Sequence, residues 1–338
     1  MAVTEDSLKF YLTSSEPLVA QTNLSESIGG YPSTTEINPS VVLNDYINRF
    51  QTNIPFTGNI DATPSYINIE HEIMSVSSIA NNEFTVNRGQ LGTAYTAHSK
   101  FDAAFNHKRI FLVNNNNLFN NSFNSNYKQY RCIAIKNTGT DTFFNLCFYI
   151  KYNSLNTNSG IKIALEVPKY GQYNGNTASG TTISLVDTSL INHPDDFENR
   201  VLTFLSGDNI NVARKIASFD ADSGTLTFTN AFPYPISAAQ SFRVDCSPAQ
   251  RIQSGSMMPT TGTIYVSNFS TATNYVNSIN INYENTRING SNLLPNDVVY
   301  VWFERSLINN KPKYLNNRII FTAAYTSELA EGFSKPAR

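Results

Sequence analysis

Charged side chains are scarce in this sequence. Asp, Glu, Lys and Arg make up only 15% of the 338 residues, and the net charge is −2. A typical globular domain carries about 25% of these residues. Proteins that bind nucleic acid usually present a basic face, and no long basic run occurs in this chain. We therefore expect no nucleic-acid partner.

Cysteine is also rare. The three cysteines include no CxxC pair and are too few for a disulfide framework. Pairing of Cys132 with Cys147 across a predicted hairpin is one alternative. The interpretation that we favour is two small, partly buried thiols in a reducing compartment.

Long apolar runs are missing as well. No stretch reaches the ~20 apolar residues that a membrane-spanning helix needs. The N-terminal stretch MAVTEDSLKFYLTSS lacks the basic start and apolar run of a signal peptide. The sequence therefore predicts a soluble chain that is made in a cytoplasm and contacts no membrane.

Aromatic residues suited to strands are plentiful. The chain has 18 Tyr and 22 Phe but one Trp and 4 Met, and aromatic side chains favour strands. Short alternating segments are separated by turn signals, and almost no helical periodicity is present. This pattern is typical of all-β sandwiches. We predict an all-β fold with a β-sandwich body and two small inserted β-domains.

The stretch Tyr127–Tyr152 predicts a central hairpin, because alternating apolar residues flank Thr138-Gly139-Thr140-Asp141. With Gly139-Thr140 as the loop, four cross-strand pairs follow from the period of two. They are Ile133 with Leu146, Ile135 with Phe144, Cys132 with Cys147 and Ala134 with Asn145.

Alternation elsewhere predicts further strands. They are Leu8–Thr13, Tyr66–Ile73 continuing through Met74–Ile79, Glu83–Asn87, Ile110–Val113, Ile161–Val167, Thr182–Val186, Arg200–Leu205, Ala213–Phe219, Thr225–Thr229, Ser241–Val244, Thr263–Asn268, Ser278–Tyr283, Val298–Ser306 and Arg318–Ala324. The pattern of Val41–Phe50 leaves helix and strand open. Composition predicts an extended arm or loop at Ser14–Pro39 and a linker at Tyr170–Gly180.

Three short motifs were weighed as candidate sites. In Glu70-His71-Glu72 the two carboxylates share one strand face, and with no second ligand cluster in sequence we interpret it as a solvated face. Asp220-Ala221-Asp222-Ser223-Gly224 lacks the glutamate that closes a calcium loop and predicts a β-turn. Arg88-Gly89-Gln90-Leu91-Gly92-Thr93 lacks the Lys-Ser/Thr ending of a phosphate loop and predicts a tight turn.

No enzyme signature stands out. A nucleophile elbow is absent, and the four histidines, His71, His98, His107 and His193, form no motif. We predict no catalytic, cofactor-binding or metal-binding residues and no cofactor. A glycan hydrolase would need two carboxylates roughly 5–10 Å apart. The first to check are Glu166, Asp195, Asp196 and Glu304.

A family resemblance rests on one pattern above all. Glu72-Ile73-Met74, Val76 and Ser78 are followed by Phe84-Thr85-Val86, Arg88-Gly89, Gly92-Thr93 and Ala97-His98. This pattern resembles a small β-module of tailed-bacteriophage tail, baseplate and other virion proteins. Two further stretches resemble pieces of phage virion proteins, Arg200–Val244 a second recurrent module and Tyr130–Thr138 the central strand of a β-sandwich.

The resemblance implies a discontinuous body formed by residues 1–50, 106–170 and 245–338. Residues 51–105 and 171–244 would then be two inserted small β-domains. It also implies a virion part without catalytic activity. In those phage proteins, segments resembling Leu8–Phe10 and Val301–Arg305 belong to the same body.

The expected function is therefore a non-enzymatic structural component of a phage particle, most often the tail or baseplate. Its partners would be copies of itself and other virion proteins. The Ser14–Pro39 arm would add a strand to a neighbour or wrap around it. Its location would be the virion, assembled in the host bacterial cytoplasm. Two alternatives remain, a capsid or neck decoration protein and a receptor-binding module for host-surface glycan. Four aromatic side chains decide the glycan alternative, since their exposure would favour it and their burial would count against it. They are Tyr170, Tyr173, Tyr300 and Trp302.

Overall fold

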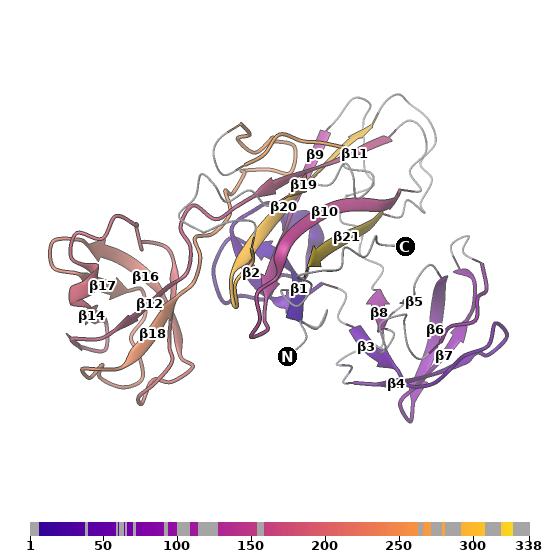
Figure 1. The fold of residues 1–338 in the computed structure, drawn as a ribbon, viewed down its shortest axis with the longest axis horizontal. Coiled ribbons are helices and arrows are strands. Elements are labelled where there is room, and N and C mark those ends of the chain that lie inside the picture. Colours follow the sequence, from indigo (N-terminus) through magenta and orange to yellow (C-terminus); the bar gives the residue numbers. More distant parts are fainter. Residues whose placement is uncertain are drawn as a thin grey trace. The chain divides into compact units, whose positions relative to one another are not determined.

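Every long element of the computed structural model is a β-strand (Figure 1). The structure describes residues 7–37, 40–58, 60, 64, 66–69, 72–90, 94–99, 109–113, 128–153, 159–262, 266–271, 279–280, 292–307 and 319–326. No α-helix occurs in these ranges, where the 3₁₀ helices η2 (Leu24–Glu26) and η4 (Thr188–Leu190) are three residues each. The predicted all-β fold is confirmed.

Two compact units divide the chain. One is Glu36–Asn117, and the other combines Met1–Thr35 with Leu118–Arg338. The predicted insertion 51–105 lies within the smaller unit, whereas the predicted insertion 171–244 belongs to the larger one. The division into a body with two inserted domains stays a prediction.

The larger unit has a β-sandwich-like body built from two sheets. A five-stranded sheet has the order β11-β20-β9-β1-β2, and a three-stranded sheet has the order β19-β10-β21. The first comprises β1 (Leu8–Ser14), β2 (Tyr31–Glu36), β9 (Lys128–Asn137), β11 (Ser159–Glu166) and β20 (Val298–Leu307). The second comprises β10 (Phe144–Asn153), β19 (Ile279–Asn280) and β21 (Ile319–Thr326).

Strands β9 and β10 lie where the sequence predicts two strands, but they do not pair with each other. Ile133 of β9 faces Leu12 of β1 on one side and Val301 of β20 on the other. Every residue from Tyr130 to Ile135 is buried, as expected of a central strand with a neighbour at each edge. The hairpin register is therefore wrong for all four predicted pairs, Ile133 with Leu146, Ile135 with Phe144, Cys132 with Cys147 and Ala134 with Asn145.

The segment after β9 carries the chain from one sheet to the other. Asn137 Nδ2 donates to Asp141 O at 2.8 Å and to Leu293 O at 3.0 Å, and Phe143 forms a β-bridge with Leu293. The turn signals at Thr138–Asp141 mark this crossing and not a hairpin loop. Cys132 is a buried free thiol, which excludes the disulfide alternative.

One face of the five-stranded sheet holds the single tryptophan in a closed core. Tyr300 and Trp302 share this face, and both are fully buried. The loops that carry Ile28, Cys246, Ala249 and Ile252 pack against them. An aromatic sugar platform at Tyr300 and Trp302 is therefore excluded, because neither ring reaches the surface.

The predicted arm Ser14–Pro39 folds back onto its own sheet. Its strand β2 lies beside β1 at the sheet edge, and Thr13 and Ser27 hydrogen-bond to each other in the interior. Only β2 is an extended strand within the predicted arm or loop, because turns, loop and the 3₁₀ helix η2 occupy the described residues before it. Composition did not indicate that the free edge of β1 would be paired by this segment of the same chain.

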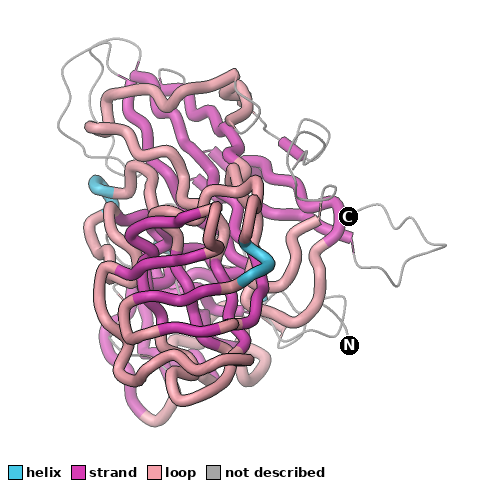
Figure 2. Tube along the Cα trace, turned by 90° about the vertical axis from the view of Figure 1, so that its left-hand side faces the viewer, coloured by secondary structure: helices cyan, strands magenta, loops and turns pink. Residues whose placement is uncertain are grey.

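A seven-stranded sheet with the order β12-β18-β15-β16-β17-β14-β13 makes up the rest of the larger unit. Figure 2 faces this sheet, whose strands run across the picture one above another. Its strands are β12 (Tyr173–Asn176), β13 (Ser179–Gly180), β14 (Ser184–Val186), β15 (Val201–Phe204), β16 (Ala213–Asp220), β17 (Thr225–Phe228) and β18 (Ser241–Val244).

The edge strands of this sheet, β12 and β13, follow each other in the chain. Only Thr177 and Ala178 separate them, so the two edges of the sheet come close together at this point. The predicted linker Tyr170–Gly180 is thus wrong, because it contains both edge strands. The entering strand β12 also pairs with the leaving strand β18, with Tyr173 opposite Val244.

The smaller unit is a closed barrel with the order β3-β4-β7-β6-β5-β8. Its strands are β3 (Ser40–Leu43), β4 (Asn53–Thr57), β5 (Tyr66–Ile69), β6 (Glu72–Ala80), β7 (Glu83–Asn87) and β8 (Arg109–Val113). Buried side chains from these strands and the loop after β3 fill it, including Leu43, Ile47, Ile54, Phe56, Ile67, Met74 and Phe84.

Hairpins define this barrel. Asn81 and Asn82 both have positive φ, 50° and 60°, as in the turns that favour two-residue hairpins. They join β6 to β7, the strands predicted at Met74–Ile79 and Glu83–Asn87. The predicted strand Tyr66–Ile73 is wrong, because Ile69 pairs with Glu72 and the chain reverses between them. The segment left open at Val41–Phe50 is a strand only as far as Leu43.

Candidate functional site

Glu72, the first residue of β6, lies inside the barrel with only 1% of its surface exposed. The β6–β7 register places Asn87 opposite Ser75, so the next residue, Arg88, is a diagonal neighbour of Glu72 on the same inward face. Arg88 Nε donates to Oε1 at 2.7 Å and Nη2 donates to Oε2 at 2.6 Å. This bidentate geometry is the strongest form of a carboxylate–guanidinium pair.

A second loop reaches the same carboxylate. His98 Nε2 donates to Glu72 Oε2 at 2.9 Å, and the Thr96 N–H donates to it at 3.0 Å. The Gly89 N–H donates to Oε1 at 3.2 Å. Both oxygens of Glu72 are therefore saturated with donors. We call Glu72, Arg88, Thr96 and His98 the glutamate clamp.

Arg88 also donates hydrogen bonds to backbone carbonyl oxygens of two neighbouring loops. Its Nη1 donates to Asn48 O and to Gln51 O, each at 2.9 Å, and its Nη2 also donates to Thr96 O. Ile47 and His98 exchange two backbone hydrogen bonds, at 3.0 and 2.9 Å. The loop after β3 and the segment around Thr96 are thus fixed to one buried ion pair.

The charge state of the clamp follows from these contacts. Burial raises the pKa of Glu72, but the hydrogen bonds from Arg88, the Thr96 N–H and His98 outweigh it and lower the pKa to about 2. Glu72 is ionised at neutral pH, and its lone pairs are occupied. A carboxylate in this state is a poor general base, and its role is to hold structure.

The structure contradicts the sequence interpretation of Glu72 as part of a solvated face. Glu70 and His71 lie outside the described residues. Arg88 and His98, which neutralise and bind Glu72, are remote in sequence, so strand periodicity alone could not reveal them. The signal that could have found them is the resemblance pattern itself, because Glu72, Arg88, Gly89 and His98 all belong to it.

Glu166 is the second buried carboxylate with defined partners. It accepts from Trp302 Nε1 and from the Gln250 N–H, each at 2.6 Å. Burial raises its pKa, and these two hydrogen bonds only partly oppose that effect, so the pKa is about 7. Trp302 is fully buried in the core of the body, and Gln250 contributes its backbone N–H from the loop after β18.

The carboxylates proposed for glycan hydrolysis do not form a pair. Glu166 lies opposite Tyr300 and Lys162 lies opposite Glu304, so Glu166 and Glu304 are four residues apart along the ladder, about 13 Å. Glu304 instead accepts from Tyr130 Oη at 3.0 Å and from Lys128 Nζ at 3.2 Å.

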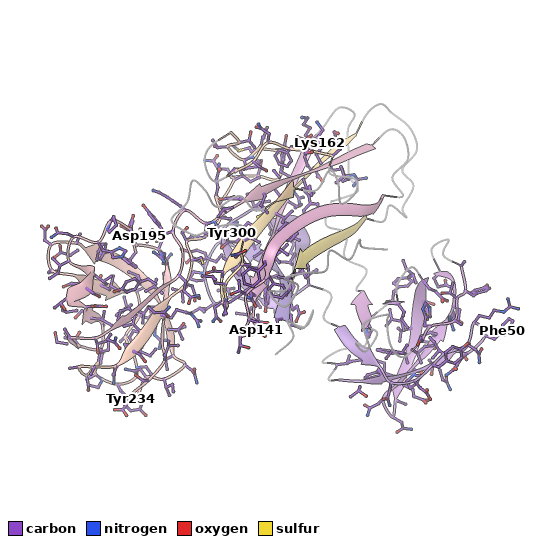
Figure 3. All side chains as sticks on the ribbon, viewed as in Figure 1. Phe50, Asp141, Lys162, Asp195, Tyr234 and Tyr300 are labelled. Atoms are coloured by element: carbon purple, nitrogen blue, oxygen red, sulfur yellow. The ribbon has the colours of Figure 1, made fainter. Side chains whose placement is uncertain are left out.

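The remaining acidic candidates lie on surface turns. Asp196 is exposed and Asp195 is partly exposed, and Figure 3 shows Asp195 on a loop beside the seven-stranded sheet. The predicted turn at Asp220–Gly224 is confirmed, since Asp220 Oδ1 accepts from the Asp222 N–H at 3.0 Å. Among the described residues, no group of three or more His, Cys, Asp or Glu side chains is arranged for a metal ion.

The other histidines and the glycine loop carry no further cluster. The ring of His193 packs edge-on against Tyr173, with ring centroids 5.3 Å apart. His107 lies outside the described residues, as do Leu91–Thr93 of the glycine loop. From that loop, Arg88 belongs to the glutamate clamp and the Gly89 N–H donates to Glu72 Oε1, so the loop also helps to hold the buried carboxylate.

Comparison with known proteins finds no match to a family model, a curated protein or a solved structure. Within the described residues, no helix is long and apolar enough to cross a membrane.

Proposed function

We propose that this chain is a non-enzymatic structural component of a tailed-phage particle, located at the tail or baseplate. It assembles through contacts with copies of itself and with neighbouring virion proteins. The observation that carries the proposal is the glutamate clamp. Three residues of the phage-like pattern meet here: Glu72 and Arg88 form a buried ion pair, and His98 hydrogen-bonds to Glu72. Their hydrogen bonds fix the neighbouring loops.

The arrangement of the seven-stranded sheet supports the same proposal. Its entering strand β12 pairs with its leaving strand β18. Just outside these strands, the Ser247 N–H donates to Tyr170 O at 3.0 Å, and the Tyr170 N–H donates to Ser247 Oγ at 3.0 Å. A module whose two ends lie side by side can be displayed on a body without disturbing it. Displayed modules provide separate surfaces for neighbours in a large assembly.

Immunogold labelling of intact particles tests the proposal, using the phage that encodes this chain and antibody pre-absorbed with purified protein as the control. Label at the tail tip, in a fixed number per particle, is the expected result. Label spread over the head would replace the tail location with capsid decoration. If neither intact nor disrupted particles were labelled, the proposal would be wrong.

A further inference from the structure

Two short chain crossings join the seven-stranded sheet to the body. At the leaving crossing, the Asp245 N–H donates to Val201 O of β15 at 2.8 Å, and the next residue, Cys246, is buried in the core of the body. At the entering crossing, Gln172 Nε2 donates to Pro295 O, in the loop before β20, at 3.1 Å. The residue after Gln172 is the first of β12. At both crossings, consecutive residues are therefore bound to the sheet and to the body.

Arg200, the residue before β15, binds both crossings from the interior. Only 1% of its surface is exposed. Its Nε donates to Asp245 O at 3.0 Å and its Nη2 donates to Gly171 O, so one guanidinium holds the leaving and the entering segment. Its Nη1 donates to Asp196 O at 3.4 Å. Moving either segment away would leave a buried, charged donor without its acceptor, which is unfavourable.

The residue before Arg200 contacts the body directly. Tyr31 Oη, from β2, donates to Asn199 O at 2.6 Å. Beside it, Lys215 of β16 donates to Glu16 Oε2 at 3.1 Å, and its Nζ lies 5.7 Å from the ring centroid of Tyr31. The Glu16 side chain is 62% exposed, and ion pairs at such positions contribute little. The contact therefore depends mainly on Tyr31 and Arg200.

We propose that Tyr31, Asn199 and Arg200 form a latch that holds the seven-stranded sheet at one fixed angle to the body. Parts of a chain that share only a small polar contact usually move relative to each other. Here a rotation of the sheet would have to break the hydrogen bonds of Arg200 at the two crossings or the bond from Tyr31 to Asn199. We call these three residues the junction latch.

A fixed angle has a consequence for any partner that touches both parts. The sheet and the body present their surfaces as one rigid piece, so such a partner loses little conformational entropy in ordering them. The inference concerns the conformation of the free chain, and it goes beyond the proposed location in a particle.

Double electron–electron resonance on the full chain tests the junction latch. Spin labels at Thr140→Cys on the body and Ala217→Cys on β16 report the angle, since both positions are exposed. The chain without these two cysteines measures any labelling of the native thiols. The expected result is a single narrow distance distribution, which Arg200→Met widens at least about twofold. A broad distribution while Arg200 is intact would overturn the inference.

Two further variants make the test specific. Arg214→Met is the matched control, because Arg214 Nε donates to Ala231 O at 2.9 Å within the sheet itself, and it should leave the distribution narrow. Tyr31→Phe removes one hydroxyl and no buried charge, and it should widen the distribution with the circular dichroism spectrum unchanged. A narrow distribution in Tyr31→Phe would overturn the latch, whether or not Arg200→Met folds. Particle labelling is independent of this result, so the latch can fail while the proposed location stands.

Discussion

At the scale of single residues, Glu72 accepts hydrogen bonds from each of the other three residues of the glutamate clamp. Replacing Glu72 by Gln keeps the shape but leaves the Arg88 guanidinium buried without its counter-charge. We expect the barrel to lose about 3–5 kcal/mol of unfolding free energy, measured by urea denaturation. Glu83→Gln, an exposed position in the same hairpin, is the control and should change the stability by less than about 0.5 kcal/mol.

The clamp also predicts an acid-sensitive barrel. The folded-state pKa of Glu72, about 2, lies below its usual value of 4.5. Its contribution is therefore complete above the unfolded-state value and is lost as the pH falls from 4.5 towards 2. Thermal melting of the wild type and of Glu72→Gln should converge over this window. A constant difference between them at all pH values would contradict the assignment.

Glu166 predicts the opposite pH dependence in the body. Its folded-state pKa of about 7 lies above its usual 4.5, so its contribution is complete below the unfolded-state value and is lost as the pH rises through 7. Trp302, the single tryptophan, donates to Glu166 at 2.6 Å and reports the titration. We expect its fluorescence to change with a midpoint near neutral pH in the wild type and not in Glu166→Gln. A signal unchanged between about pH 5 and pH 9 would refute this.

At the scale of elements, the β6–β7 turn requires a positive φ at both of its central residues. Asn82 has a φ of 60°, a conformation that glycine adopts without strain and that β-branched residues avoid. Asn82→Gly should leave the melting temperature unchanged or raise it, and Asn82→Val should cost about 1–2 kcal/mol. Equal stability of the two variants would mean that the turn does not adopt this conformation in solution.

Strand positions were largely predictable from the sequence, and strand partners were not. Alternation at Val298–Ser306 and Lys128–Asn137 records which side chains share a face, and both strands appear where predicted. Alternation does not indicate which other strand is the hydrogen-bonded neighbour. β9 is adjacent to β10 in the chain but pairs with β1 and β20, which come from opposite ends of it. Only tertiary packing decides that choice.

The candidate site was harder to predict for the same reason. Glu72 reads as a surface residue because an isolated carboxylate in a strand belongs in water. Its burial depends on Arg88 and His98 together, and neither residue has a local pattern that points to it. Buried charges are paired in proteins, so the burial of Glu72 could be predicted only together with its partners Arg88 and His98.

At the scale of the whole molecule, the seven-stranded sheet should be separable from the body. Its chain ends lie together at Tyr170 and Ser247. Deleting residues 172–245 and inserting one glycine should leave a body that melts cooperatively, with Trp302 emission still blue-shifted by burial. Non-cooperative melting or a red-shifted tryptophan would show that the body needs this sheet to fold.

The central claim is that the chain is a built-in part of a particle. Quantitative mass spectrometry of purified particles, with an isotope-labelled copy of the chain as the standard, tests it most directly. We expect a fixed copy number relative to the other virion proteins. A trace amount that varies from one preparation to the next would contradict the account.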